Sequence, residues 1–94
     1  MARVVWSLGA RDDLHRIVSY IRADAPAYAQ SFALRLNDRL TQLQSFPDSG
    51  RFVPEDPSQT YRELIFGNYR VVYRHSEGTV TIVTVIHGAR ILRF

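Results

Sequence analysis

Residues 67–74 decide the fold of this chain, and they read Gly67-Asn68-Tyr69-Arg70-Val71-Val72-Tyr73-Arg74. Similar runs lie on either side, namely Tyr61-Arg62-Glu63-Leu64 and Val85-Ile86-His87-Gly88-Ala89-Arg90. Strand interiors favour Val, Ile and aromatic residues, whereas a guanidinium keeps its charge at any ordinary pH and needs an anion or water. We therefore expect three neighbouring strands whose arginines, tyrosines and histidine form a binding surface.

Turn residues separate these strands. Gly67-Asn68 joins two strand-like runs, which predicts a hairpin with glycine at the positive-φ position of a type II′ turn. A second reversal is expected at residues 75–78. Residues 79–87 are β-branched at nearly every position, which predicts a central strand covered on both faces. A short strand at residues 3–6 should join the same sheet.

Two amphipathic helices are expected between the first strand and the others. The first runs from residue 8 to about residue 23, capped by Ser7, and the second runs from Pro26 to about Ser45. Apolar residues recur at helical spacing in both, at Leu14, Ile17, Val18 and Ile21, and at Ala29, Phe32, Ala33, Leu36, Leu40 and Leu43. The turn-rich residues 46–59 predict a loop. The expected fold is α+β, with the order β-α-α-β-β-β and a helical hairpin packed on a mostly antiparallel sheet.

Length and composition indicate one domain over residues 1–94. The chain has 94 residues, 46% of them hydrophobic, which is enough for one core. Twelve basic and nine acidic side chains give a net charge of +3, and every basic residue is an arginine. This mild positive charge permits a nucleic-acid or acidic protein partner without requiring one.

Several functional classes are disfavoured by the composition. There is no cysteine, and the three histidines show none of the short spacings of a metal motif, so we expect no metal and no cofactor. No segment approaches the roughly 20 apolar residues of a membrane span, and the N-terminal apolar run is shorter than a secretory signal core. We expect a cytoplasmic protein without a membrane partner.

The motifs resemble those of the RelE/ParE toxin superfamily, over nearly the whole chain. They are residues 10–14 through Tyr20-Ile21, the loop at residues 47–55, Arg62-Glu63, residues 69–73 and residues 87–90. The resemblance implies a toxin of a type II toxin–antitoxin pair of the kind linked to plasmid stabilisation. It also implies a small antitoxin that wraps around the toxin in a hetero-oligomeric complex.

Two activities occur on this fold, so the fold by itself does not choose between them. RelE-like members cut messenger RNA on the ribosome, and ParE-like members block DNA gyrase. The loop at residues 50–55 and the ending at residues 87–90 resemble the ParE branch. The absence of lysine and of a terminal His and Tyr pair also disfavours a nuclease. The expected partners are therefore a ParD-like antitoxin and DNA gyrase, with the ribosome and mRNA as the alternative.

A metal-free nuclease would need a base, an acid and a cation for the crowded phosphate. The residues available for those roles are Glu63, His87 and Arg70, with Arg62 as a second cation and Tyr69 or Tyr73 to stack on a base. Candidates for contact with the target or the antitoxin are Arg51, Glu55, Arg62, Arg70, Arg74, Tyr73, His87 and Arg90. A third reading is a plain RNA-binding module without toxicity.

Structural roles are open for several of these residues. Glu63 can instead form a cross-strand ion pair with an arginine, and His87 can be a hydrogen-bonded residue at a strand end. Strand alternation turns Tyr69, Val71 and Tyr73 toward the helices and leaves Arg70 and Arg74 outward. An outward Arg70 would contribute little to stability, so Arg70→Ala is expected to leave the fold intact. Four apolar residues lie outside the apolar faces of the two helices, namely Leu34, Val53, Ile91 and Phe94. They suggest a groove for an acidic antitoxin helix.

Overall fold

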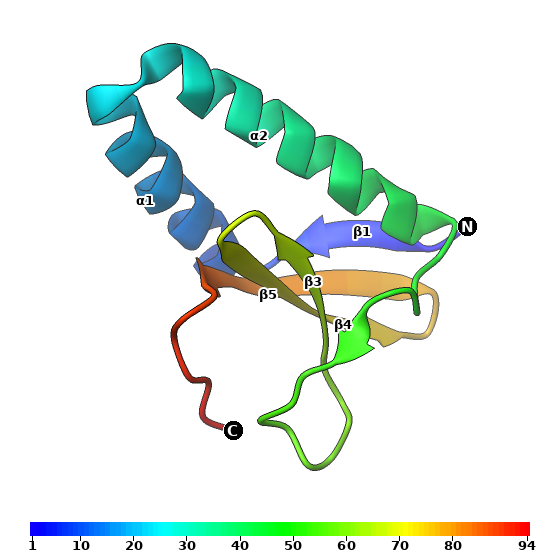
Figure 1. Ribbon diagram of the computed structural model, residues 1–94. Coiled ribbons are helices and arrows are strands. Elements are labelled where there is room, and N and C mark those ends of the chain that lie inside the picture. Colours follow the sequence, from blue (N-terminus) through cyan, green and yellow to red (C-terminus); the bar gives the residue numbers. More distant parts are fainter.

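Two helices form a hairpin on one side of a five-stranded sheet in the computed structural model, which describes residues Met1 to Phe94 (Figure 1). The elements in chain order are β1 (Arg3–Trp6), α1 (Leu8–Asp24), α2 (Pro26–Thr41), a 3-10 turn (Gln42–Gln44), β2 (Arg51–Phe52), β3 (Arg62–Phe66), β4 (Tyr69–Ser76) and β5 (Thr79–His87). The strand order is β1-β5-β4-β3-β2. Only the β1–β5 pair is parallel, so the predicted α+β fold is confirmed.

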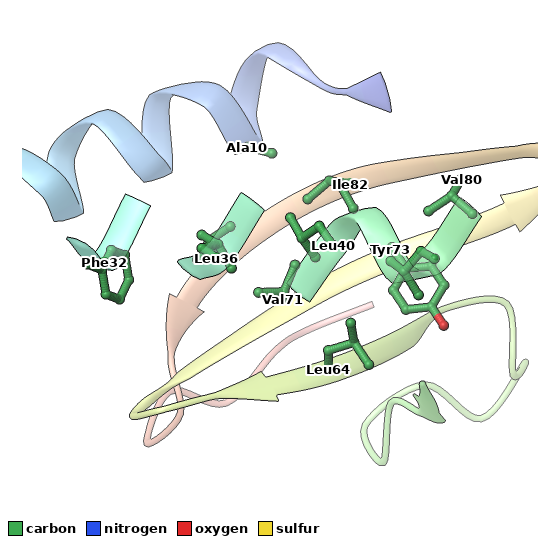
Figure 2. Close-up of a cluster of buried hydrophobic side chains, with 11 residues drawn as sticks. Ala10, Phe32, Leu36, Leu40, Leu64, Val71, Tyr73, Val80 and Ile82 are labelled. Carbon is green, nitrogen blue, oxygen red and sulfur yellow. The ribbon is translucent and has the colours of Figure 1, made fainter. Parts of the chain in front are cut away.

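The core lies between the hairpin and the sheet, as the helical spacing predicts. Phe32, Leu36 and Leu40 from α2 meet Val71 and Tyr73 from the sheet in one buried cluster (Figure 2). The apolar stripe of α1 packs against the edge of this cluster and is only half-buried. Strand alternation sends the side chains between these sheet residues to the opposite face, where the candidate site lies.

The start of α1 also completes the hydrogen bonding of β5. Ser7 caps the helix by accepting from the Ala10 N–H at 3.0 Å. Pairing between β1 and β5 ends at Trp6, and beyond that point Asp13 accepts from the Val85 N–H at 3.1 Å and from the Thr84 hydroxyl at 2.6 Å. A helix carboxylate thus takes the place of a strand partner and fixes where α1 crosses the sheet.

Both predicted turns are present. Gly67 has φ of 57°, as a type II′ turn requires at its first central residue, while Glu77 and Gly78 have φ of 53° and 75°. These reversals place β3, β4 and β5 side by side. The residues that read as three neighbouring strands in the sequence are therefore neighbours in the sheet.

Three details of the predicted fold are wrong. The α-helical geometry of α2 ends at Thr41 and tightens into a 3-10 turn, rather than continuing to Ser45. Residues 46–59 contain the short strand β2, which pairs with β3. The strand covered on both faces is β4, in which residues 70–73 are all buried. In β5, by contrast, several residues are only half-buried. β-branching reports strand propensity, and coverage depends on the loop and tail packed against the far face.

That far face is covered by the loop between β2 and β3 and by the residues after β5, both on the side away from the hairpin (Figure 1). Asp56 organises the loop, because its carboxylate accepts from Ser58, Thr60 and Tyr61 at 2.6–3.0 Å. The Ser58 hydrogen bond is the main cause that lowers the pKa of Asp56. Phe94 at the chain end packs on Tyr61, with ring centroids 5.3 Å apart.

The four apolar residues expected to form a partner groove lie in different environments. Val53 is buried in the loop that covers the sheet, so including it in a surface groove was wrong. Leu34, Ile91 and Phe94 are exposed as predicted. Leu34 lies on α2, whereas the other two follow β5, so these residues do not come from one segment. Neither α1 nor α2 combines the length and the apolar character that a membrane-spanning helix requires.

Candidate functional site

Arg70 forms the centre of a buried ion cluster on the far face of the sheet. Its Nε donates to Glu63 Oε1 at 2.7 Å, and Nη2 lies 2.7 Å from the same oxygen. Nη1 and Nη2 each donate to one oxygen of Glu55 at 2.7 Å, and Nη1 also donates to the Arg90 carbonyl at 3.1 Å. The guanidinium therefore uses its donors on two carboxylates and one carbonyl of its own chain.

This geometry overturns the prediction that Arg70 points outward. The residue lies on the expected face of β4, but only 6% of it is exposed. Strand alternation correctly separates the two faces, but it does not reveal that a loop and the chain end cover the second one. Arg70 is thus an internal structural element and is not free for a partner to contact.

Glu63 links Arg70 to Arg51. The Glu63 side chain is fully buried on β3, and its Oε2 accepts from Arg51 Nε at 2.6 Å. The predicted cross-strand ion pair of Glu63 is therefore present, and it is formed with two arginines. Two arginines and two carboxylates balance within the cluster of Arg51, Glu55, Glu63 and Arg70, hereafter the ion cluster, which is what burial of charge requires.

Glu55 connects the ion cluster to the end of the chain. Besides Arg70, its Oε2 accepts from the Leu92 N–H at 2.9 Å. Hydrogen bonds from Arg70 and then from Leu92 lower the pKa of Glu55 to about 2, and the Glu55 hydrogen bond raises the pKa of Arg70. Glu55 is therefore an anion throughout the physiological range.

A cleft of about 410 Å³ opens beside the ion cluster. Five predicted site residues line it, namely Arg51, Glu55, Tyr69, Arg70 and His87. They come from β2, the following loop, β4 and β5, and the two turns at residues 67–68 and 88–89 close the rim. The fold thus brings Arg51 and His87, which are 36 positions apart in the chain, into one surface.

His87 lies exposed at the end of β5, where its ring meets Tyr69 edge to face with centroids 5.8 Å apart. Its Nδ1 accepts from the Ala89 N–H at 3.2 Å, and the Arg90 N–H donates to its carbonyl. Because Nδ1 accepts this hydrogen bond, a neutral His87 ring carries its proton on Nε2, and Nε2 is therefore a donor. The predicted hydrogen-bonded strand-end role of His87 is therefore observed.

Three predicted arginines, Arg62, Arg74 and Arg90, do not line the cleft. Arg62 donates to the carbonyls of Asp48 and Gly50 at 3.1 and 2.9 Å, and its guanidinium lies 4.1 Å from the centre of the Phe52 ring. Arg74 is exposed on β4 near the opposite end of the strand from the cleft, and the Arg90 side chain is exposed after β5.

Tyr73 is fully buried, so stacking on a base or contacting a partner was a wrong prediction. Its ring belongs to the core, and its hydroxyl, at the edge of the cluster in Figure 2, accepts from the Gly50 N–H at 2.9 Å. Tyrosine is in the core because its ring fills space there while its hydroxyl finds a backbone partner.

Two polar arrangements were missed from the sequence. His75 Nδ1 lies 2.9 Å from Asp48 Oδ1, and this hydrogen bond is the main cause that lowers the pKa of Asp48. Arg35 on α2 lies over two aromatic rings, from Tyr28 and Phe66. Tyr28 and Arg35 are seven residues apart, which is two helical turns, so they lie on the same face of α2. This spacing was the one feature of the sequence that could have predicted their contact.

Comparisons with known proteins point in one direction. Residues 4–92 match the family described as ParE toxin of the type II toxin–antitoxin system parDE. The candidate toxin Y4kP of Sinorhizobium fredii is 35% identical over 88 residues, covering 92% of this chain and 88% of that protein.

Solved structures show the same fold. A chain of the chromosomal ParDE toxin–antitoxin system from P. aeruginosa is similar with a TM-score of 0.80 and 20% identity, covering 93% of this chain and 96% of that one. A chain of the RelBE2 toxin–antitoxin complex from Mycobacterium tuberculosis is similar with a TM-score of 0.64 and 24% identity, covering 92% and 96%.

Proposed function

The chain belongs to the ParE toxin family of type II toxin–antitoxin systems, and on this premise we propose that it inhibits DNA gyrase by a protein–protein contact. A ParD-like antitoxin neutralises it in a cytoplasmic hetero-oligomer. The proposal includes no cofactor and no metal. The RelE-like alternative is cleavage of mRNA on the ribosome.

The ion cluster is the observation that carries the proposal. Metal-free RNA cleavage needs a cation that meets the crowded phosphate and a base that accepts the 2′-hydroxyl proton. Arg70 is instead held by Glu55 and Glu63 of its own chain. A phosphate would have to displace a buried, doubly paired guanidinium from both carboxylates, which is costly.

His87 supports the same reading. A general base needs an unprotonated nitrogen that faces the substrate, and Nδ1 of His87 already accepts the Ala89 N–H. The neutral ring therefore presents a donor at Nε2. A donor of this kind, beside the partly exposed guanidinium of Arg51, is suited to hydrogen bonds with a protein surface.

The surface proposed for contact is therefore the exposed part of the cleft and its neighbourhood. Arg51 has 61% of its side chain exposed, and His87, which lines the same cleft, is also exposed. Arg90 is exposed in the segment after β5. Arg74 adds an exposed charge outside the cleft, toward the opposite end of β4. Exposed Ile91 and Phe94 supply apolar area next to these charges, as an amphipathic acidic antitoxin segment would need.

One experiment separates the two activities. Purified toxin is added to a gyrase supercoiling and cleavage assay and, in parallel, to translating ribosomes followed by mapping of message ends. The expected result is loss of supercoiling with accumulation of gyrase-cleaved DNA and intact messages. The toxin–antitoxin complex is the control and should be inactive in both. Unaffected gyrase together with codon-linked message cuts would reverse the order of the two candidates.

The nuclease alternative is kept because of a specific observation. His87, Tyr69 and Arg51 share the cleft of about 410 Å³, which is in the size range of small-ligand sites and places a ring beside a partly exposed cation. Message cleavage that disappears on substitution of His87 would support it.

A further inference from the structure

A second hollow, of about 250 Å³, lies between the helical hairpin and the β3–β4 turn. We call it the aromatic hollow. Besides the turn residues Gly67 and Asn68, the residues that line it are Ile21, Tyr28, Phe32, Arg35, Phe66 and Tyr69. Gly67, Asn68 and Tyr69 also line the first cleft, so the two depressions lie on either side of this turn. Nothing in the proposed function uses the aromatic hollow.

The floor of the aromatic hollow is made of aromatic rings that pack against one another. Phe32 is 3% exposed and lies at one end of the buried cluster (Figure 2). Its ring meets Phe66 and Tyr69 edge to face, with centroids 5.4 and 5.5 Å away. Tyr28, 52% exposed, forms the outer wall at 6.4 Å from Phe32. Ring edges and faces fixed in this way provide a preformed surface for another ring.

Arg35 supplies a charge at the rim without an anion to balance it. Its guanidinium lies 5.5 Å from the Tyr28 ring centre and 6.0 Å from that of Phe66, and its Nε donates to the Ser31 hydroxyl at 3.2 Å. Unlike Arg16, Arg51, Arg62 and Arg70, it forms no salt bridge. A guanidinium held over rings keeps donors that fit a carboxylate.

We propose that the aromatic hollow binds one aromatic side chain from an acidic segment of a partner protein, with a neighbouring carboxylate on Arg35. The volume favours a single side chain, since sites for drug-sized ligands measure about 300–1,000 Å³. An aromatic anchor beside an arginine is the composition typical of interface hot spots. The inference does not depend on whether the target is gyrase or the ribosome.

Three capped tripeptides test the proposal by titration into isotope-labelled toxin, with backbone amide shifts as the readout. Their sequences are acidic–tryptophan–acidic, lysine–tryptophan–lysine and acidic–alanine–acidic. The first should shift the amides of Arg35 and of residues 66–69, and it should bind about fivefold more tightly than the second, as one exposed ion pair allows. The alanine peptide should produce no saturable shift at these positions.

Two variants and one control assign the binding to named groups. Arg35→Gln should remove the preference for the acidic peptide over the lysine peptide, and Tyr28→Ala should weaken both tryptophan peptides. Both residues are exposed, so the fold should be retained, which the amide spectrum itself reports. Arg22→Gln removes an exposed arginine of α1 outside the aromatic hollow and should change nothing.

The proposal is overturned by any of three results. These are shifts that map to another surface, equal binding of the alanine and tryptophan peptides, and an acidic preference that survives Arg35→Gln. Toxicity and gyrase assays do not enter this test, so its failure leaves the proposed function unaffected.

Discussion

Arg70 and Glu55 form a two-point ion pair in which each terminal guanidinium nitrogen donates to a separate carboxylate oxygen at 2.7 Å. The pair joins β4 to the loop that follows β2, and through Leu92 it also holds the end of the chain. One carboxylate therefore ties together β4, the loop after β2 and the residues after β5. Several consequences of this arrangement are measurable.

Arg70→Ala should destabilise the protein by about 3 kcal/mol or more, because it leaves Glu63 and Glu55 without their shared cation. Urea denaturation followed by circular dichroism measures the change. The matched control is Arg74→Ala, which removes an exposed arginine of the same strand and should cost less than about 0.5 kcal/mol. Equal midpoints for the two variants would contradict the buried role. Loss of toxicity in Arg70→Ala must accordingly be read together with its stability.

Glu55→Gln should flatten the acid dependence of stability. The pKa of Glu55 is about 2 in the folded protein, below its ordinary value of 4.5. The charged form is thus favoured by folding, and its contribution is present above pH 4.5 and is lost as the pH falls toward 2. Denaturation curves at a series of pH values should show a shallower decline for Glu55→Gln across this window. Parallel curves for the two proteins would mean that Glu55 is not held by Arg70 in solution.

Gly50→Ala should be destabilising by about 1–3 kcal/mol, because overpacking has no room to relax here. A Cβ at Gly50 would lie 2.7 Å from the Glu63 carbonyl oxygen and 2.7 Å from the Tyr73 hydroxyl. The control is Gly9→Ala in α1, where the nearest atoms would be 3.9 Å away and alanine favours the helix. Thermal melts should therefore move in opposite directions, and a neutral Gly50→Ala would show that the loop can shift.

His87→Ala separates binding from catalysis. For a gyrase contact the change removes one exposed donor, so inhibition should weaken only a few-fold. For a nuclease with His87 as base or acid, the rate should fall by about 10²–10⁴. Growth after induction and the purified gyrase assay provide the readouts. Complete loss of gyrase inhibition in a folded His87→Ala protein would give His87 a larger role than proposed.

Local pattern was enough to predict most of the fold. The spacing of Phe32, Leu36 and Leu40 identified the buried side of α2, and Gly67 marked the hairpin turn, because helix periodicity and positive φ are properties of short segments. The C-terminal end of α2 and the strand β2 were not predicted correctly. Both depend on contacts with distant residues, and two residues of strand carry too little pattern to recognise.

For the site residues, too, local pattern predicted some properties, and contacts with distant residues decided the others. Strand alternation placed Arg70 and Tyr73 on opposite faces, and it identified Glu63 as a partner for an arginine across the sheet. It did not show that Arg70 is buried, since the covering groups are Glu55 and the backbone near Arg90, about 15–20 positions away in the chain. Tyr73 was misassigned because the sequence shows its hydroxyl group but not the Gly50 N–H that donates a hydrogen bond to that hydroxyl.

The amino-acid sequence by itself determined the helical hairpin, the order of the main helices and strands along the chain and the gathering of charged residues on three of the strands, because periodicity and turn chemistry act over a few residues. Only the tertiary structure decided which charges are free. Whether an arginine faces solvent or a carboxylate depends on the loop and chain end that fold over the sheet. For that reason Arg70 became an internal ion pair, whereas Arg35, on the hairpin side of the sheet, lies over two aromatic rings without a salt bridge.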